Sequence, residues 1–111
     1  KQGGARNDAL RRRARWRLCE VWMGQSDWGT TLAHLLRFLE EYPEDGHRFE
    51  ARYFVGKAFI ELSMPQKAKR QWDIVSREDA NGVFGKLAQL ELKMLAWRKN
   101  QLDKVLKPIK L

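Results

Sequence analysis

The sequence predicts an all-α chain made of helical hairpins stacked in series, and three observations support this fold class. Apolar residues recur at spacings of three and four along most of the chain, as they do on one face of a helix. The interruptions carry Gly, Pro, Asp and Ser, which are typical of turns. One pattern of two helices also recurs after 37 residues. The 111 residues, of which 43% are apolar, are enough for one small domain over residues 1–111.

Five helices and a short tail are expected. Asp8 is a suitable N-cap for the first helix, and Pro43 ends the second because proline disfavours helical geometry at the residue before it. Pro65 is well placed in the first turn of the fourth helix. The tail from Asn100 could begin a sixth helix, which Pro108 would break early. The expected helices cover residues 8–24, 28–42, 48–62, 65 to about 75, and 83–98.

Apolar stripes on these helices predict which faces are buried. The stripe of the second helix comprises Leu32, Leu35, Leu36 and Leu39. The stripe of the first helix, which we expect to be its buried face, comprises Leu10, Ala14, Leu18, Val21 and Trp22.

The odd-numbered helices align when the sequence is shifted by 37 residues. Ala14, Ala51 and Ala88 stand at equivalent places, and in the even-numbered helices Leu35 aligns with Trp72. A period in the range of about 20–50 residues with two helices per unit indicates a helical solenoid, in which each unit buries its apolar face against its neighbours. The expected units are about 10–46, 47–82 and 83–111, and the last one is incomplete.

The segment ARYFVGKAFIELSMPQKAKRQWDIV, residues 51–75, resembles the tetratricopeptide repeat (TPR) family. Gly56 stands at the family's small position in the first helix and Phe59 at its aromatic position. Ala68 and Trp72 hold the small and aromatic positions of the second helix. The link YPEDGHRFEA extends the usual unit of about 34 residues, and looks like the link in bacterial envelope TPR proteins such as the Tol–Pal coordinator and the outer-membrane assembly lipoprotein. The resemblance implies a right-handed superhelix of TPR-like hairpins.

The resemblance also implies a concave groove, lined by the first helix of each unit, where a segment of another protein would bind. Tryptophan, tyrosine, methionine and leucine are common at protein-binding hot spots and adaptable surfaces. The alternative is that several of these residues pack against a neighbouring helix. The predicted groove residues are Arg13, Trp16, Glu20, Met23, Glu50, Tyr53, Lys57, Ile60, Leu87, Leu90, Met94 and Trp97.

The fifth helix is apolar on nearly every side, although the end helix of a stacked array needs a polar outer face. We therefore expect either further repeats beyond it or a partner that covers it, and that partner could be a second copy of the chain. The predicted function is a non-catalytic scaffold for protein–protein interaction. It acts by binding a partner segment in the groove or by self-association through the fifth helix.

The chain is strongly basic, because 22 Lys and Arg residues against 14 Asp and Glu residues give a formal net charge of +8. This balance favours acidic proteins and polyanions as partners. The arginines around Trp16 form a solvated helix face, a contact surface for acidic proteins, or a surface that follows a phosphate backbone. The alternative function is therefore a basic nucleic-acid-binding module, and contact with anionic lipid is a third reading. The basic patch comprises Arg11, Arg12, Arg15 and Arg17.

No catalytic site, cofactor or metal centre is expected. The single cysteine, Cys19, excludes an internal disulfide, and with only two histidines the chain offers no recognisable set of metal ligands. Cys19 is expected to be a buried small side chain. No glycine-rich phosphate loop occurs, and no apolar run approaches the length of about 20 residues that a membrane span needs. The resemblance suggests a bacterial periplasmic or envelope-associated setting, with the cytoplasm as the alternative.

Overall fold

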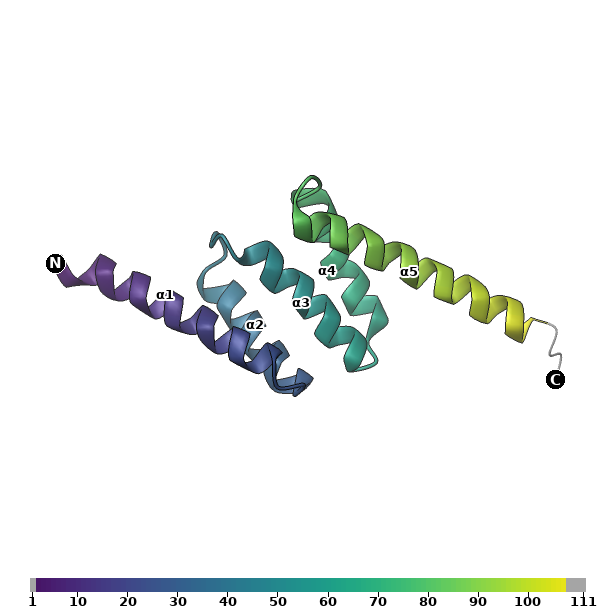
Figure 1. Cartoon of the computed structure of the whole chain (residues 1–111), viewed down its shortest axis with the longest axis horizontal. Helices are drawn as coiled ribbons and strands as arrows, with labels where there is room; N and C mark the ends of the chain where they lie inside the picture. Colours follow the sequence, from purple (N-terminus) through teal and green to yellow (C-terminus); the bar gives the residue numbers. More distant parts are fainter. Residues whose placement is uncertain (1, 108–111) are drawn as a thin grey trace.

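A computed structural model describes residues 2–107, which form five α-helices (Figure 1). They are α1 (Gln2–Met23), α2 (Trp28–Glu41), α3 (Arg48–Glu61), α4 (Pro65–Glu78) and α5 (Val83–Leu106). No strand occurs within residues 2–107, so the predicted all-α class is confirmed for this part of the chain.

Each helix packs against the next one in the chain and runs antiparallel to it (Figure 1). The chain therefore advances as a row of hairpins and is elongated, with principal extents of 70 × 30 × 19 Å. The inner helices have a neighbour on two sides, and α3 also contacts α5. The end helices α1 and α5 extend away from the centre on opposite sides (Figure 1), which leaves more of their surfaces open.

The boundaries of the inner helices have local causes that the sequence reveals. Asp27 caps α2, since its Oδ1 accepts a hydrogen bond from the backbone N–H of Thr30 at 3.1 Å. α2 ends just before Tyr42, where the following Pro43 disfavours helical geometry. Pro65 occupies the first turn of α4, where its missing N–H costs no hydrogen bond. The predicted starts of these helices are confirmed.

The two end helices are longer than predicted. α1 begins at Gln2, so Asp8 does not cap it; the Oδ1 atom of Asp8 instead lies 3.6 Å from Nη1 of Arg11, one turn further along the helix. α5 continues to Leu106, so the prediction of a break near residue 98 was wrong, and the residues of the expected sixth helix extend the fifth. Pro108, the expected helix breaker, lies outside the described residues.

A backbone feature recurs with the 37-residue period and explains the length of α5. Ser26 and Ser63 have positive φ angles of 61° and 62°, in the turns that follow α1 and α3. A left-handed residue commonly terminates a helix in this way. The equivalent residue of the third unit, Asn100, lies inside α5. Gly24 and Pro65 stand two residues from Ser26 and Ser63, whereas residues 98–102 contain no glycine or proline, so α5 lacks the neighbouring helix breaker that the two earlier turns have.

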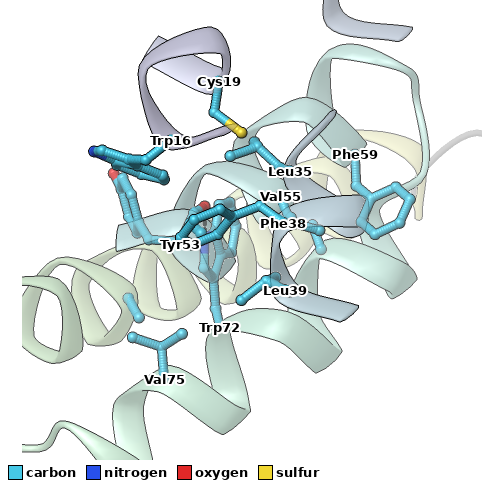
Figure 2. Close-up of a cluster of buried hydrophobic side chains, with 13 residues drawn as sticks. Trp16, Cys19, Leu35, Phe38, Leu39, Tyr53, Val55, Phe59, Trp72 and Val75 are labelled. Carbon is cyan, nitrogen blue, oxygen red and sulfur yellow. Dashed lines mark hydrogen bonds between the residues drawn. The ribbon is translucent and has the colours of Figure 1, made fainter. Parts of the chain in front are cut away.

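The buried core extends along the interfaces between successive helices, and its centre is the α3–α4 hairpin (Figure 2). Gly56 faces Trp72, and a Cβ atom on residue 56 would overlap the indole ring. The Nε1 atom of Trp72 donates a hydrogen bond to the carbonyl oxygen of Tyr53 at 3.0 Å. Ala68, Trp72 and Val75 of α4 are buried, and the missing side chain at Gly56 allows the close approach of the two helices.

The buried face of α1 is not the predicted one. Trp16 and Cys19 are buried on the opposite side of the helix, and the Trp16 ring lies 5.1 Å from the ring of Phe38 in α2. Trp22 is half-buried and stacks on His34. Both faces of α1 carry apolar residues at helical spacing, but α2 covers only one of them. The predicted residues that are exposed instead are Leu10, Ala14, Leu18 and Val21.

Candidate functional site

The structure separates the predicted groove residues into buried and exposed groups. Trp16 and Tyr53 are only 6% and 7% exposed, so both pack in the core, as the alternative interpretation held. The ring of Trp16 stacks on that of His47, with the two centroids 4.5 Å apart. The half-buried group comprises Met23, Glu50, Lys57 and Ile60. The exposed group comprises Arg13, Glu20, Leu87, Leu90, Met94 and Trp97.

Four of these exposed residues form a continuous row on α5, which we call the α5 stripe: Leu87, Leu90, Met94 and Trp97. Their spacing of three and four residues places them on one face of the helix. The exposed fraction of their side chains ranges from 36% for Leu87 to 62% for Trp97. An apolar row of this kind on a solvent-facing helix marks a surface whose burial against a partner is energetically favourable.

One end of the α5 stripe adjoins a small hollow of about 180 Å³ between α3, α4 and α5. Lys57 and Ile60 of α3 line one wall, and Met94 and Leu95 of α5 line the other. The indole of Trp72 is also among the lining groups. The predicted groove residues of the second and third units therefore do meet here, and an apolar side chain of a partner has a recess beside the stripe.

A hydrogen-bonded group fixes α5 relative to α3 at this place. The hydroxyl of Tyr53 donates to Oε2 of Glu91 at 2.8 Å, and Nζ of Lys57 lies 3.1 Å from the same oxygen. Burial, together with the neighbouring carboxylate of Glu91, raises the pKa of Tyr53 above its ordinary value, so the phenol stays protonated and remains a donor. The side chain of Glu91 is therefore committed to the fold, and it holds the α5 stripe in position.

Basic side chains border the α5 stripe along one edge, and the other edge has mixed charge. Lys86 and Lys93 are exposed and lie seven residues apart, which places them along the same edge of the helix. Arg98 is exposed on the other edge and lines the hollow together with the carboxylates of Glu61 and Glu91. An apolar surface with a cationic border favours a partner segment that combines apolar and acidic residues.

Four arginines of the predicted basic patch have carboxylate neighbours within the chain. Nε of Arg12 lies 3.1 Å from Oδ2 of Asp45, a carboxylate that is largely buried. The other three pairs are Arg11–Asp8 at 3.6 Å, Arg15–Glu41 at 3.6 Å and Arg17–Glu20 at 3.8 Å. These carboxylates compete with an external phosphate backbone, so the local positive potential is lower than the count of arginines suggests.

Between α1 and α3 the surface has mixed charge. Burial raises the pKa of Glu50 above its ordinary value of 4.5; the nearby His47 opposes this shift and Glu20 adds to it. The adjacent hollow is lined by Arg13, Glu20 and His47 among others. This part of the predicted groove offers no apolar row like the α5 stripe, so the third unit provides the stronger candidate surface.

Cys19 is a packing residue, as predicted. It is 1% exposed, and its Sγ lies 3.4 Å from the carbonyl oxygen of His34 (Figure 2 shows its place in the core). Burial raises its pKa to about 11, which keeps the thiol protonated and unreactive. Within the described part of the chain, no group of His, Cys, Asp or Glu side chains could hold a metal ion. No helix among residues 2–107 is long and apolar enough to cross a membrane.

Some residues of the candidate surface were not predicted. Lys86, Lys93 and Arg98 border the stripe, and only the seven-residue spacing of the two lysines could have placed them together from the sequence. Glu91 has no sequence signal, since its partner Tyr53 is far away in the chain. Comparisons of the chain with protein-family models, curated proteins and solved structures found no match.

Proposed function

We propose that the chain is a non-catalytic scaffold for protein–protein interaction that binds an apolar, acidic segment of another protein along the α5 stripe. The observation that carries this proposal is the row of four large, exposed apolar side chains with two exposed lysines, Lys86 and Lys93, along one border. Removing apolar surface from water stabilises association by about 25 cal/mol per Å². The apolar row would supply the affinity, and the basic border would select acidic partners and speed their encounter.

We further propose that the chain is a TPR-type solenoid with a 37-residue unit. Two recurrences and one close contact support this fold assignment. Ala51 and Ala88, which are 37 residues apart, are both fully buried. Ser26 and Ser63 share one turn conformation at the same spacing. Gly56 packs directly against the aromatic residue of the following helix, as expected for the small position of the unit.

The border charges favour a different protein over a second copy of this chain. A symmetric dimer through the α5 stripe would place Lys86 and Lys93 of one copy near the same residues of the other. Like charges at an interface are costly. The internal ion pairs of the arginine patch likewise make the nucleic-acid alternative the weaker proposal.

Photocrosslinking with a designed peptide tests the proposal. The probe is a labelled amphipathic helix with a leucine row bordered by glutamates and one photoreactive leucine analogue; the matched control peptide has lysines in place of the glutamates. We expect crosslinks on α5 between residues 87 and 98, and a loss of about tenfold or more in their yield in the Leu90→Glu, Met94→Glu variant. The control variant Leu36→Glu alters a leucine on α2 that is exposed to a similar extent as Met94 and should leave the yield unchanged.

The alternatives give different results in the same experiment. Equal crosslinking by the lysine-bordered peptide would contradict the role of the basic border. If light scattering shows that the parent chain is a dimer and that the Leu90→Glu, Met94→Glu variant is a monomer, the occupant of the α5 stripe is a second copy of the chain and not a different protein. Tight binding of an oligonucleotide that is lost when Arg11 and Arg17 become glutamine, while the peptide does not bind, would favour the nucleic-acid module.

A further inference from the structure

The exposed face of α1 forms a second apolar surface, separate from the α5 stripe. We call it the α1 seam: Leu10, Ala14, Leu18 and Val21. These residues lie on the side of α1 opposite to the buried Trp16 and Cys19. Leu10 is 54% exposed and Val21 50%, and within residues 2–107 no helix covers them. The seam lies at the other end of the elongated chain from the free part of α5 (Figure 1).

The chain itself contains a covered copy of this surface. Shifting Ala14, Leu18 and Val21 of the seam by 37 residues gives Ala51, Val55 and Ala58 of α3, all of which are completely buried. Leu10 shifts to His47, which is exposed and lies just before α3. On α3 the side that contains Gly56 faces Trp72 of α4. Ala51, Val55 and Ala58 lie on a different face of α3, and α3 also packs against α2. In the repeat, then, this face is covered by an antiparallel helix from the preceding hairpin.

Charge identifies the kind of helix that would cover α1. Arg11 and Arg17 lie on the two edges of the seam, with Arg6 and Arg13 just beyond one of them. Arg11 lies 3.6 Å from a carboxylate oxygen of Asp8, and Arg17 lies 3.8 Å from one of Glu20. Both ion pairs are exposed to solvent and therefore weak, so the two arginines can also pair with a partner. A second copy of α1 or of the lysine-bordered α5 would bring like charges together, whereas an acidic helix would bring opposite ones.

We infer that the α1 seam is a docking surface for an amphipathic helix of another protein, with acidic residues beside its apolar row, which packs antiparallel to α1 as α2 packs on α3. This inference goes beyond the proposed function, because it concerns a different helix and the other end of the chain. A scaffold with both surfaces would hold two acidic partners at opposite ends. Nucleic acid would need the arginines but not the leucines of the seam.

A peptide made from α2 tests the inference. The probe is a labelled peptide of residues 27–42 with the substitution Arg37→Glu, which makes it strongly acidic; the matched control has its acidic residues replaced by Asn and Gln. Binding is measured by fluorescence anisotropy to the whole chain carrying Leu90→Glu and Met94→Glu, so that the α5 stripe is disabled and the two proposals are tested separately. We expect saturable binding that weakens as salt is added.

Variants then locate the binding site. Leu10→Ser with Leu18→Ser should weaken binding at least tenfold, and Arg11→Gln with Arg17→Gln should weaken it about threefold to tenfold. Leu102→Ser, at a leucine 58% exposed on α5, is the matched control and should bind as well as the parent. Circular dichroism of each variant should show unchanged helix content, because every altered side chain is exposed.

Several results would overturn the inference. Binding that is unaffected by the leucine changes would show that the peptide docks elsewhere. Equal affinity of the uncharged control peptide would show that the seam does not select acidic partners. A dimer in light scattering that dissociates with Leu10→Ser and Leu18→Ser would mean that a second copy covers the seam. Competition by an oligonucleotide that depends on the arginines but not on the leucines would make the surface a nucleic-acid site.

Discussion

The indole ring of Trp72 lies against the backbone of Gly56, and its Nε1 donates a hydrogen bond to the carbonyl oxygen of Tyr53 at 3.0 Å. One aromatic side chain of α4 therefore fixes both the distance between α3 and α4 and their register. The same ring lines the hollow beside the α5 stripe. The packing of this hairpin thus determines where the candidate binding surface lies.

A methyl group at residue 56 should destabilise the chain, although alanine favours helix formation more than glycine. The Cβ would overlap a rigid indole ring, and overpacking of a core typically costs about 1–3 kcal/mol, against a gain of about 1 kcal/mol from helix propensity. We expect Gly56→Ala to lower the free energy of unfolding in urea by up to about 2 kcal/mol, the difference between these two effects. Gly29→Ala is the control, because the space around Gly29 is open, and it should be neutral or slightly stabilising.

Replacing a left-handed serine with glycine should stabilise the chain. Ser63 has a φ angle of 62° in the turn before Pro65, a conformation that glycine adopts without steric cost. Ser63→Gly should raise the free energy of unfolding by about 0.5–1 kcal/mol. Ser76→Gly, in the last turn of α4, should lower it instead, because glycine is a poorer helix former than serine. A loss of stability in Ser63→Gly would show that the turn is not left-handed in solution.

The carboxylate of Asp45 should make stability depend on pH. Burial alone would raise its pKa, but hydrogen bonds from the backbone N–H and the ring Nδ1 of His47, at 2.8 and 2.9 Å, together with Arg12, lower it below the ordinary value of 3.8. A carboxylate whose pKa is lower in the folded state contributes stability above its unfolded pKa, and this contribution is lost as the pH falls through the folded value.

Asp45→Asn should therefore destabilise the chain at pH 7 by about 1–3 kcal/mol. The difference from the parent chain should shrink as the pH falls below 3.8 and approach zero once Asp45 is protonated in the folded state. Urea denaturation at a series of pH values measures this difference. Asp8→Asn, at a largely exposed carboxylate, is the control and should change little. A constant difference at all pH values would mean that the carboxylate charge is unimportant.

The contact between Tyr53 and Glu91 should contribute to the position of α5. Tyr53→Phe removes the hydroxyl that donates to Glu91 at 2.8 Å, and loss of a hydrogen bond to a charged group costs about 1.5–3 kcal/mol. We expect a loss of stability in this range and faster amide hydrogen exchange in α5. Tyr42→Phe serves as the control. If hydrogen exchange in α5 does not change, the helix is held by its apolar contacts alone.

Much of the fold follows from local signals in the sequence. Pro43 and Pro65 mark helix boundaries, and Gly56 and Trp72 indicate the closely packed hairpin. The larger errors concern the end helices, for which local signals are ambiguous; among the inner helices, α4 continues to Glu78 and Leu36 of the predicted stripe is 42% exposed. α1 has two apolar faces, and only its long-range contact with Phe38 decides which one is buried.

The candidate site is predictable to a similar degree. The α5 stripe follows from spacing alone, whereas the burial of Trp16 and Tyr53 depends on contacts with residues far away in the sequence, namely His47 and Glu91. No pattern within a single helix contains that information. The length of α5 cannot be read from Asn100, a residue that tolerates a turn; what this position lacks is a neighbouring glycine or proline.

The most direct test of the central claim is a methionine-methyl NMR titration of the chain with the glutamate-bordered peptide. Met94 lies in the α5 stripe and is 45% exposed, while Met64, in the turn between α3 and α4, is 42% exposed and serves as an internal control. We predict that the Met94 methyl signal shifts saturably with added peptide and that the Met64 signal does not. A Met94 signal that stays unchanged when the peptide is bound would contradict the assignment of the α5 stripe as the docking surface.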